Sequence, residues 1–445
     1  MSKTFRPWLV EQAWLLPPSV RELVPAGDPA HFVRDLVRDE LDLSAIVDSY
    51  DEERGFPPYH PVMMTALLLY AYTQGIYSSR RIARGCQTRV DFMAVTAMQQ
   101  PDHRTVCDFR KRHLGALGDL FGQVLKLCQR AGMVKLGHVA LDGTKINANA
   151  SKRKAMSYAR MKKSEQELET IVAEWLAKAD AIDEAEDREF GADRRGDELP
   201  EWVKDKAKRL EVIRAAKAEL EAEAKAALAA PKPDPDDPDP NKPRRRRKRR
   251  NTPKANGEPN DKAQLNFTDP DSTILKTSDG YLQGYNCQLA VDGKEQVIVA
   301  HALVNEQNDA LQLPSMLEAI RRNTGRQAKE VSADTGYLST ENLRELKRRR
   351  IRGYIATARQ ARGPARSAAP AAKNPLAREM AAKLKRGGHR SRYRLRKQIV
   401  EPAIGQIKEA RGFRRFLLRG LDKVPREWAL VCTAHNLVKL AKKVA

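Results

Sequence analysis

The chain has 445 residues, and its 81 lysines and arginines exceed its 58 acidic residues to give a formal net charge of +23. This length suits two to four domains, since a domain usually has roughly 100–200 residues. An excess of positive charge attracts polyanions, and no segment is long and apolar enough to span a membrane. Composition therefore favours a nucleic acid as partner and excludes a membrane protein.

The N-terminal 20 residues lack the pattern of a signal peptide, because polar residues and two prolines interrupt their apolar residues. The five cysteines are scattered and form no Cys-x-x-Cys pair. We therefore expect a reducing cytoplasm and no zinc site.

Residues 1–131 are predicted to be mostly helical. Ser78 and Ser79 can begin one helix, and Asp102 can cap another over His103–His113. The basic residues of these two helices are candidate DNA contacts: Arg80, Arg81, Arg104 and Arg110. The connection between the helices is longer than the turn of a helix-turn-helix, so a helical domain with solvated basic faces stays an alternative.

A change of composition follows residue 150. Apolar residues recur at i, i+3, i+4 and i+7 through 168–182 and again through 203–224, which predicts an antiparallel helical hairpin. Residues 231–264 alternate proline with aspartate and then become strongly basic up to Arg250. This composition predicts a flexible linker, whose basic part would add salt-sensitive affinity for phosphates.

The most informative stretch is 138–149, in which apolar Val139–Leu141 runs into Asp142 and Gly143. It is either a buried strand that ends at Asp142 or a hairpin with an Asp-Gly turn. Two downstream patterns favour the strand. A second apolar run ends at Asp334, and Glu401 lies in a basic, helix-like stretch.

Between these acids the sequence predicts a mixed sheet with helices on its faces. Residues 284–292 and 296–302 are predicted strands joined by the hairpin signal Asp292-Gly293-Lys294. Further strands are expected around 331 and over 353–356. Helices are expected over 310–322, 340–349, 396–409 and 427–443. Without residues 151–264, the separation of Asp142 and Asp334 falls from 192 to 78 positions, which suits one α/β domain.

Three carboxylates brought together repel one another unless cations neutralise them. Mg²⁺ suits such a site because it prefers hard oxygen ligands and keeps open water positions. Two such ions roughly 3.5–4 Å apart can activate a water and stabilise the leaving 3′ oxygen of a phosphodiester. The pattern is therefore consistent with nuclease or strand-transfer chemistry.

Several motifs resemble those of bacterial insertion-sequence transposases of the DDE type, in the group with a Tyr-Arg-Glu-Lys signature. They are Trp14–Ser19, Tyr77–Arg80 and Pro101–Thr105 in the N-terminal part, and Gly284–Gln288, Ala333–Tyr337 and Gly412–Phe416 in the catalytic part. The resemblance extends close to end to end.

The resemblance implies an α/β catalytic domain of ribonuclease H-like fold, an all-α N-terminal domain and an inserted helical hairpin. The expected division is a DNA-binding domain over 1–131, the first catalytic strands over 132–150, the hairpin over 151–230, the linker over 231–264 and the rest of the catalytic domain over 265–445. Asp142, Asp334 and Glu401 are then both catalytic residues and metal ligands. The implied cofactor is two Mg²⁺ ions, for which Mn²⁺ can substitute.

Lys408 lies seven residues after Glu401 and matches the signature lysine. Counting back from Glu401 places Lys397 at the arginine position, whereas Arg396 lies one residue early. Lys408, Lys397 and Arg396 join the candidate DNA contacts. Pro402 predicts either a kink just before Glu401 or a helix that begins there. Glu409 is an alternative third acid.

The function implied is binding of insertion-sequence ends, followed by metal-dependent DNA cleavage and strand transfer. The expected partners are element ends and target DNA, with a homodimer assembled on DNA in the bacterial cytoplasm, at the nucleoid. Two alternatives remain open. One is a decayed transposase that only binds DNA ends, and the other is a hydrolytic nuclease of the same fold.

Overall fold

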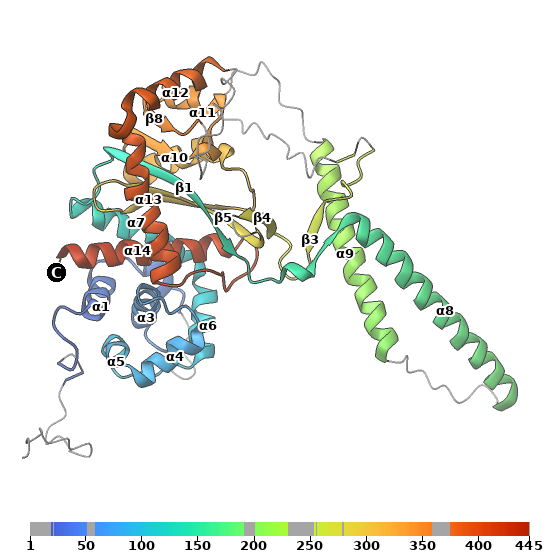
Figure 1. Cartoon of the computed structure of the whole chain (residues 1–445). Coiled ribbons are helices and arrows are strands. Elements are labelled where there is room, and N and C mark those ends of the chain that lie inside the picture. Colours follow the sequence, from blue (N-terminus) through green and yellow to red (C-terminus); the bar gives the residue numbers. More distant parts are fainter. Residues whose placement is uncertain are drawn as a thin grey trace, which may run out of the picture.

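The computed structural model describes residues 19–20, 22–50, 58–190, 201–229, 253–254, 256–277, 280–357 and 374–444 (Figure 1). The N-terminal region is helical, as predicted. Its helices are α1 (Pro29–Asp39), α2 (Ser44–Val47), α3 (Pro61–Thr73), α4 (Ser79–Thr88), α5 (Val90–Thr96), α6 (His103–Arg112) and α7 (Leu114–Arg130). Asp102 caps α6 by accepting a hydrogen bond from the N–H of Arg104 at 2.6 Å.

The second part is a mixed sheet with helices packed against it. The strands are β1 (His138–Asn147), β4 (Thr273–Thr277), β5 (Gly280–Asp292), β6 (Ile298–Val304), β7 (Glu330–Ala333) and β8 (Arg352–Ile355). Their order is β4-β5-β1-β7-β8, and β6 pairs with β5 beyond the part that β4 uses. β5 is antiparallel to β4, β6 and β1, whereas β1, β7 and β8 are mutually parallel. The predicted β5–β6 hairpin is confirmed.

The helices of this part are α10 (Leu313–Thr324), α11 (Thr340–Arg348), α12 (Pro375–Gly387), α13 (Leu395–Gly405) and α14 (Val424–Val444). One continuous hydrophobic core joins the N-terminal helices to the sheet. Helix α14 lies at the junction, because it packs against α3, α7 and β6 and buries Trp428 completely. The two parts therefore share their interior.

The structure corrects one detail of the sequence analysis. Asp142 lies within β1, and the strand neither turns nor ends there. Residues 143–147 continue to pair with residues 284–288 of β5. The long partner strand supplies hydrogen bonds past Asp142, and these override the local turn preference of Asp-Gly.

The insertion begins and ends at a separate two-stranded sheet. Strand β2 (Ala155–Ser157) pairs with β3 (Gln264–Asn266) and leads into the long helices α8 (Tyr158–Phe190) and α9 (Glu201–Ala229), which project away from the sheet (Figure 1). A separate hydrophobic cluster joins α8 and α9 to β3 and the residue before it. Its buried members are Tyr158, Met161, Ile213, Ala216, Leu220, Ala263 and Leu265.

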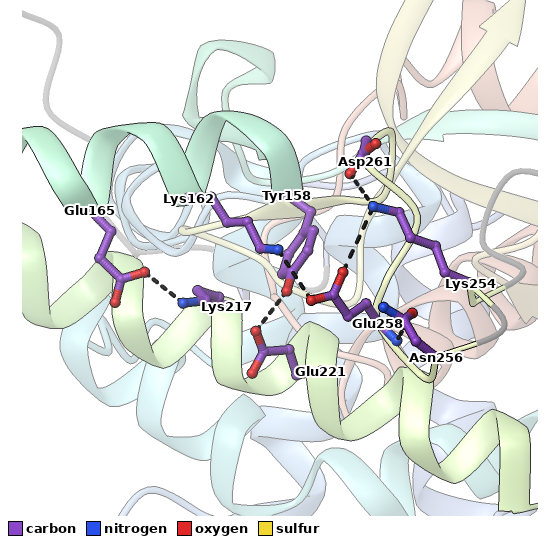
Figure 2. A network of polar contacts seen from close by, with 9 residues as sticks. All are labelled: Tyr158, Lys162, Glu165, Lys217, Glu221, Lys254, Asn256, Glu258 and Asp261. Atoms are coloured by element: carbon purple, nitrogen blue, oxygen red, sulfur yellow. Dashed lines mark hydrogen bonds and ion pairs between the residues drawn. The ribbon is translucent and has the colours of Figure 1, made fainter.

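Polar contacts join α8 to α9, and α8 to the segment before β3 (Figure 2). Tyr158 donates from its hydroxyl to Glu221 at 2.7 Å, and Lys162 contacts Glu258 at 3.3 Å. Most of the predicted linker, residues 231–252, lies outside the described residues.

Candidate active site

Asp142 lies on β1, and Asp334 directly follows the neighbouring parallel strand β7. The register of β1 and β7 pairs Ala140 with Ser332, and continuing it by two residues places Asp142 beside Asp334. Asp334 follows the last residue of β7 and accepts a hydrogen bond from the N–H of Gly336 at 2.8 Å. The sequence analysis placed Asp334 at a strand end, and this is confirmed.

Glu401 comes from α13, which packs against β1 and β5. The guanidinium of Arg396, on the same helix, links it to Asp142. Nη1 of Arg396 lies 2.7 Å from Oδ2 of Asp142, and Nη2 lies 3.1 Å from Oε1 of Glu401. Glu401 is largely exposed, whereas the side chains of Asp142 and Arg396 are mostly buried. A single cation thus bridges two of the three predicted acids.

Helix α13 begins at Leu395 and runs through Pro402, so a helix that begins at Glu401 is excluded. Proline has no N–H to donate to the carbonyl of the residue four positions earlier, Gln398. That carbonyl instead accepts a hydrogen bond from Nε2 of Gln296 at 2.9 Å. The interior proline is therefore tolerated because a neighbouring loop supplies the missing donor. A π-helix, Gln406–Ala410, follows directly.

Lys408 lies in this π-helix and turns towards β1. Its Nζ lies 3.3 Å from Oγ1 of Thr144 and 3.3 Å from the carbonyl oxygen of Lys145. Its ammonium is thus held two to three residues along the strand from Asp142. The alternative acid Glu409 is exposed and ion-paired with Arg414, which lies after the helix. This geometry favours Glu401 over Glu409.

The pKa values of the acids are shifted by burial and by neighbouring charges. Burial raises the pKa of Asp142 from its ordinary 3.8 to about 7; Arg396 opposes the rise and Asp334 adds to it. Burial also raises the pKa of Asp334, and Asp309 adds to this rise. For Arg396, burial lowers the pKa, but the negative charges around it, Asp142 foremost, raise it above the ordinary value.

The donor set suits a divalent metal, although the side chains are not arranged around one. Among the described residues no group of three or more His, Cys, Asp or Glu side chains is close enough to hold an ion. Asp142 and Glu401 instead share the Arg396 guanidinium, which donates to both. Carboxylate oxygens that already share one cation fit a hard divalent ion once Arg396 withdraws.

The candidate DNA contacts divide into two groups. Arg80 and Arg81 on α4, Arg104 on α6 and Lys397 on α13 are exposed. Arg110 is 4% exposed and donates to the carbonyl of Tyr77 at 2.8 Å. Arg110 therefore ties α6 to the start of α4, and its guanidinium is not presented to DNA.

Sequence reasoning missed one acid of this site, Asp309, and the amides that hold it. Asn286 and Gln288 donate to Oδ1 of Asp309, each at 2.7 Å. The available signal was two amide side chains at alternate positions of the buried part of β5. Asp309 begins a short 3-10 helix and follows no apolar run, so the pattern of an apolar strand followed by an acid did not identify it.

Comparison with known families adds two matches. Residues 18–112 match the family model described as Transposase domain (DUF772), and residues 356–441 match the model described as Transposase DDE domain. These matches support an insertion-sequence DDE transposase. No curated protein and no solved structure matches the chain.

The DDE match includes Glu401 and Lys408, whereas Asp142 and Asp334 lie between the two matched segments. The DDE domain indicates a DNA-cleaving enzyme, and its family generally uses a divalent metal. Within the described part of the chain, no helix has the length and apolarity needed to cross a membrane.

Proposed function

We propose that this transposase binds the ends of an insertion sequence and catalyses metal-dependent strand cleavage and strand transfer in a ribonuclease H-like domain. The observation that carries the proposal is the grouping of Asp142, Asp334 and Glu401. Asp142 lies on β1, Asp334 directly follows the neighbouring strand β7, and Arg396 bridges Asp142 and Glu401. The mixed sheet flanked by helices supports the ribonuclease H-like assignment.

Asp142, Asp334 and Glu401 would hold two Mg²⁺ ions, for which Mn²⁺ can substitute. When bound, such ions supply an activated water and stabilise the leaving 3′ oxygen. The side chains of the protein would position the metal ions and balance the charges of the carboxylates. Arg396 offsets part of the negative charge of Asp142 and Glu401, and its long side chain would let it move from the carboxylates to a DNA phosphate. Lys408 would hold a phosphate beside β1.

Affinity for DNA would come from the basic surface. The exposed side chains of Arg80, Arg81 and Arg104 belong to helices that pack against each other, so they form one candidate surface for phosphates. Lys397 would add a contact near the acids. The basic run of residues 242–250 lies outside the described residues. Assembly as a homodimer on DNA, in the bacterial cytoplasm at the nucleoid, belongs to the same proposal.

The test uses the full chain, Mg²⁺ and a labelled DNA that carries the flanking ends of its own genomic locus. Asp142→Asn, Asp334→Asn and Glu401→Gln should each abolish cleavage, because the acids act as one unit. Binding to the DNA ends should persist, since these changes leave the basic side chains in place. Glu409→Gln is the matched control and should cleave normally.

The products separate the functions that share this site. Joined DNA products support a transposase, whereas nicked products alone would support a hydrolytic nuclease. If all three variants cleave like the parent, the proposed active site is wrong. If Glu409→Gln is inactive and Glu401→Gln is active, the third acid is Glu409.

A further inference from the structure

Asp309 begins a short turn (Asp309–Leu311) between β6 and α10, and its carboxylate is held in a fixed orientation. Oδ1 accepts from the amides of Asn286 and Gln288. The Gln288 amide is itself oriented, because its Oε1 accepts a hydrogen bond from the Tyr337 hydroxyl. Three side chains from β5 and the segment after β7 therefore fix one carboxylate of a loop.

Two glycines make room for this carboxylate. A Cβ on Gly143 would lie 2.7 Å from Oδ1 of Asp309, closer than real Cβ contacts. A Cβ on Gly336 would lie 3.0 Å from Oδ2 of Asp309 and 3.0 Å from Oδ1 of Asp334. Neither glycine has a positive φ. The glycines that follow Asp142 and Asp334 are therefore explained by the space that Asp309 needs.

The surroundings of Gly336 also show which of the other acids lies close to Asp309. Oδ2 of Asp309 and Oδ1 of Asp334 approach the same point from two elements. Asp142 contacts Arg396, whereas a Cβ on the next residue of β1, Gly143, would point at Asp309, because successive residues of a strand face opposite sides. Asp309 thus approaches from the side away from Arg396. The partner of Asp309 is Asp334.

These two carboxylates form no ion pair within the described part of the chain, although Lys145 is close enough for their charges to oppose the lowering of its pKa by burial. Among the described residues no lysine, arginine or histidine forms an ion pair with either Asp309 or Asp334. Both acids line a cavity of about 690 Å³, together with Lys145. Gln283, which is 4% exposed, lines the same cavity, and its Oε1 has no hydrogen-bond partner in the described part of the chain. The cavity is therefore lined by the carboxylates of Asp309 and Asp334 and by the Gln283 carbonyl oxygen, which can accept a hydrogen bond or bind a cation.

We propose that Asp309 is a fourth acidic residue of the active site, which binds a divalent metal ion jointly with Asp334. This inference rests on the proposed function. A purely structural role, as acceptor for Asn286 and Gln288, does not require a negative charge, since a neutral amide oxygen accepts the same bonds. It also does not account for the second oxygen directed towards Asp334.

The decisive variant is Asp309→Asn, because it keeps an acceptor oxygen for both amides and removes the charge. Mn²⁺ binding to the full chain without DNA is measured by electron paramagnetic resonance. Glu306→Gln is the matched control, since it removes the same charge three residues earlier in the same loop, from a side chain that does not line the cavity. Affinity should fall by roughly 10-fold or more in Asp309→Asn, as for other changes around metal ligands, and stay unchanged in the control.

Thermal unfolding without metal separates the two roles of Asp309. The metal-binding role predicts a Tm that is unchanged or higher in Asp309→Asn, because repulsion from Asp334 disappears. A lower Tm with unchanged Mn²⁺ affinity would overturn the inference in favour of the structural role. If Asp309→Asn does not fold, Gly143→Ala decides. Its Cβ would displace the Asp309 carboxylate and leave every charge in place, so unchanged Mn²⁺ affinity would refute the inference.

The same measurement separates this inference from the function on which it rests. If Asp142→Asn and Asp334→Asn weaken Mn²⁺ binding and Asp309→Asn does not, only the role of Asp309 is refuted. If none of the three affects Mn²⁺ binding, the proposed metal site itself fails.

Discussion

Replacing Asp142 with asparagine should stabilise the metal-free protein, and the gain should depend on pH. The folded protein holds the pKa of Asp142 at about 7, against an ordinary 3.8. Below pH 3.8 the carboxyl is protonated in both the folded and the unfolded chain, so no buried charge lowers the free energy of unfolding. Between these values only the unfolded chain loses the proton, so the free energy of unfolding falls as pH rises. Above pH 7 the carboxylate is charged in both states, and the free energy of unfolding is lowered by the full amount.

The size of this effect follows from the two pKa values. A difference of about three pKa units corresponds to about 4 kcal/mol at 25 °C. Asparagine does not ionise and avoids this cost. Asp142→Asn should therefore match the parent near pH 4 and exceed its free energy of unfolding by about 4 kcal/mol near pH 8.

The assay is urea unfolding of both proteins, followed by circular dichroism in EDTA at pH values from 4 to 8.5. Asp119→Asn, which removes an exposed carboxylate from α7, is the matched control and should leave the free energy of unfolding nearly unchanged. A stability difference that does not vary with pH, or an Asp142→Asn variant that is less stable at pH 8, would refute the reasoning.

Three further predictions follow from the arrangement of charges and of the insertion. Arg396→Ala should raise Mn²⁺ affinity in the absence of DNA, by roughly 10-fold for each 1.4 kcal/mol of competition removed, as titration would show; an unchanged affinity would contradict the competition. Affinity for arbitrary duplex DNA should fall roughly 10³-fold or more between 50 and 200 mM salt if six or more phosphates are contacted, and a nearly flat dependence would contradict phosphate binding. Replacing residues 158–263 with an Asn-Gly turn between β2 and β3 should leave soluble protein with cooperative unfolding, because the insertion has its own hydrophobic cluster; insoluble protein would show that the insertion completes the core.

Local sequence patterns predicted the elements that depend on local signals. The β5–β6 hairpin and the cap of α6 follow from residues a few positions apart, and both are confirmed. The position of Asp142 within β1 could not be predicted in this way. It depends on β5, which is more than 130 positions away in the chain and pairs with β1 beyond the acid.

The candidate site shows the same limit. Asp334 was placed correctly because an apolar run precedes it, but the contact between Arg396 and Asp142 joins residues 254 positions apart. Counting along the signature favoured Lys397, which is exposed, and gave no sign that its neighbour Arg396 reaches two carboxylates. Asp309 was missed because its contacts come from a strand and a turn that the chain brings together only when the sheet forms.

Helix α14 has a consequence for the order of events during protein synthesis. The ribosome makes helices α1, α3 and α7 first, yet the apolar side chains that cover them belong to a helix made some 300 residues later. The interior of the N-terminal region, to which the proposed DNA-binding helices α4 and α6 also belong, therefore stays incomplete while the nascent chain lacks α14. The N-terminal helices and the sheet would therefore complete their packing together, once the last helix has been made.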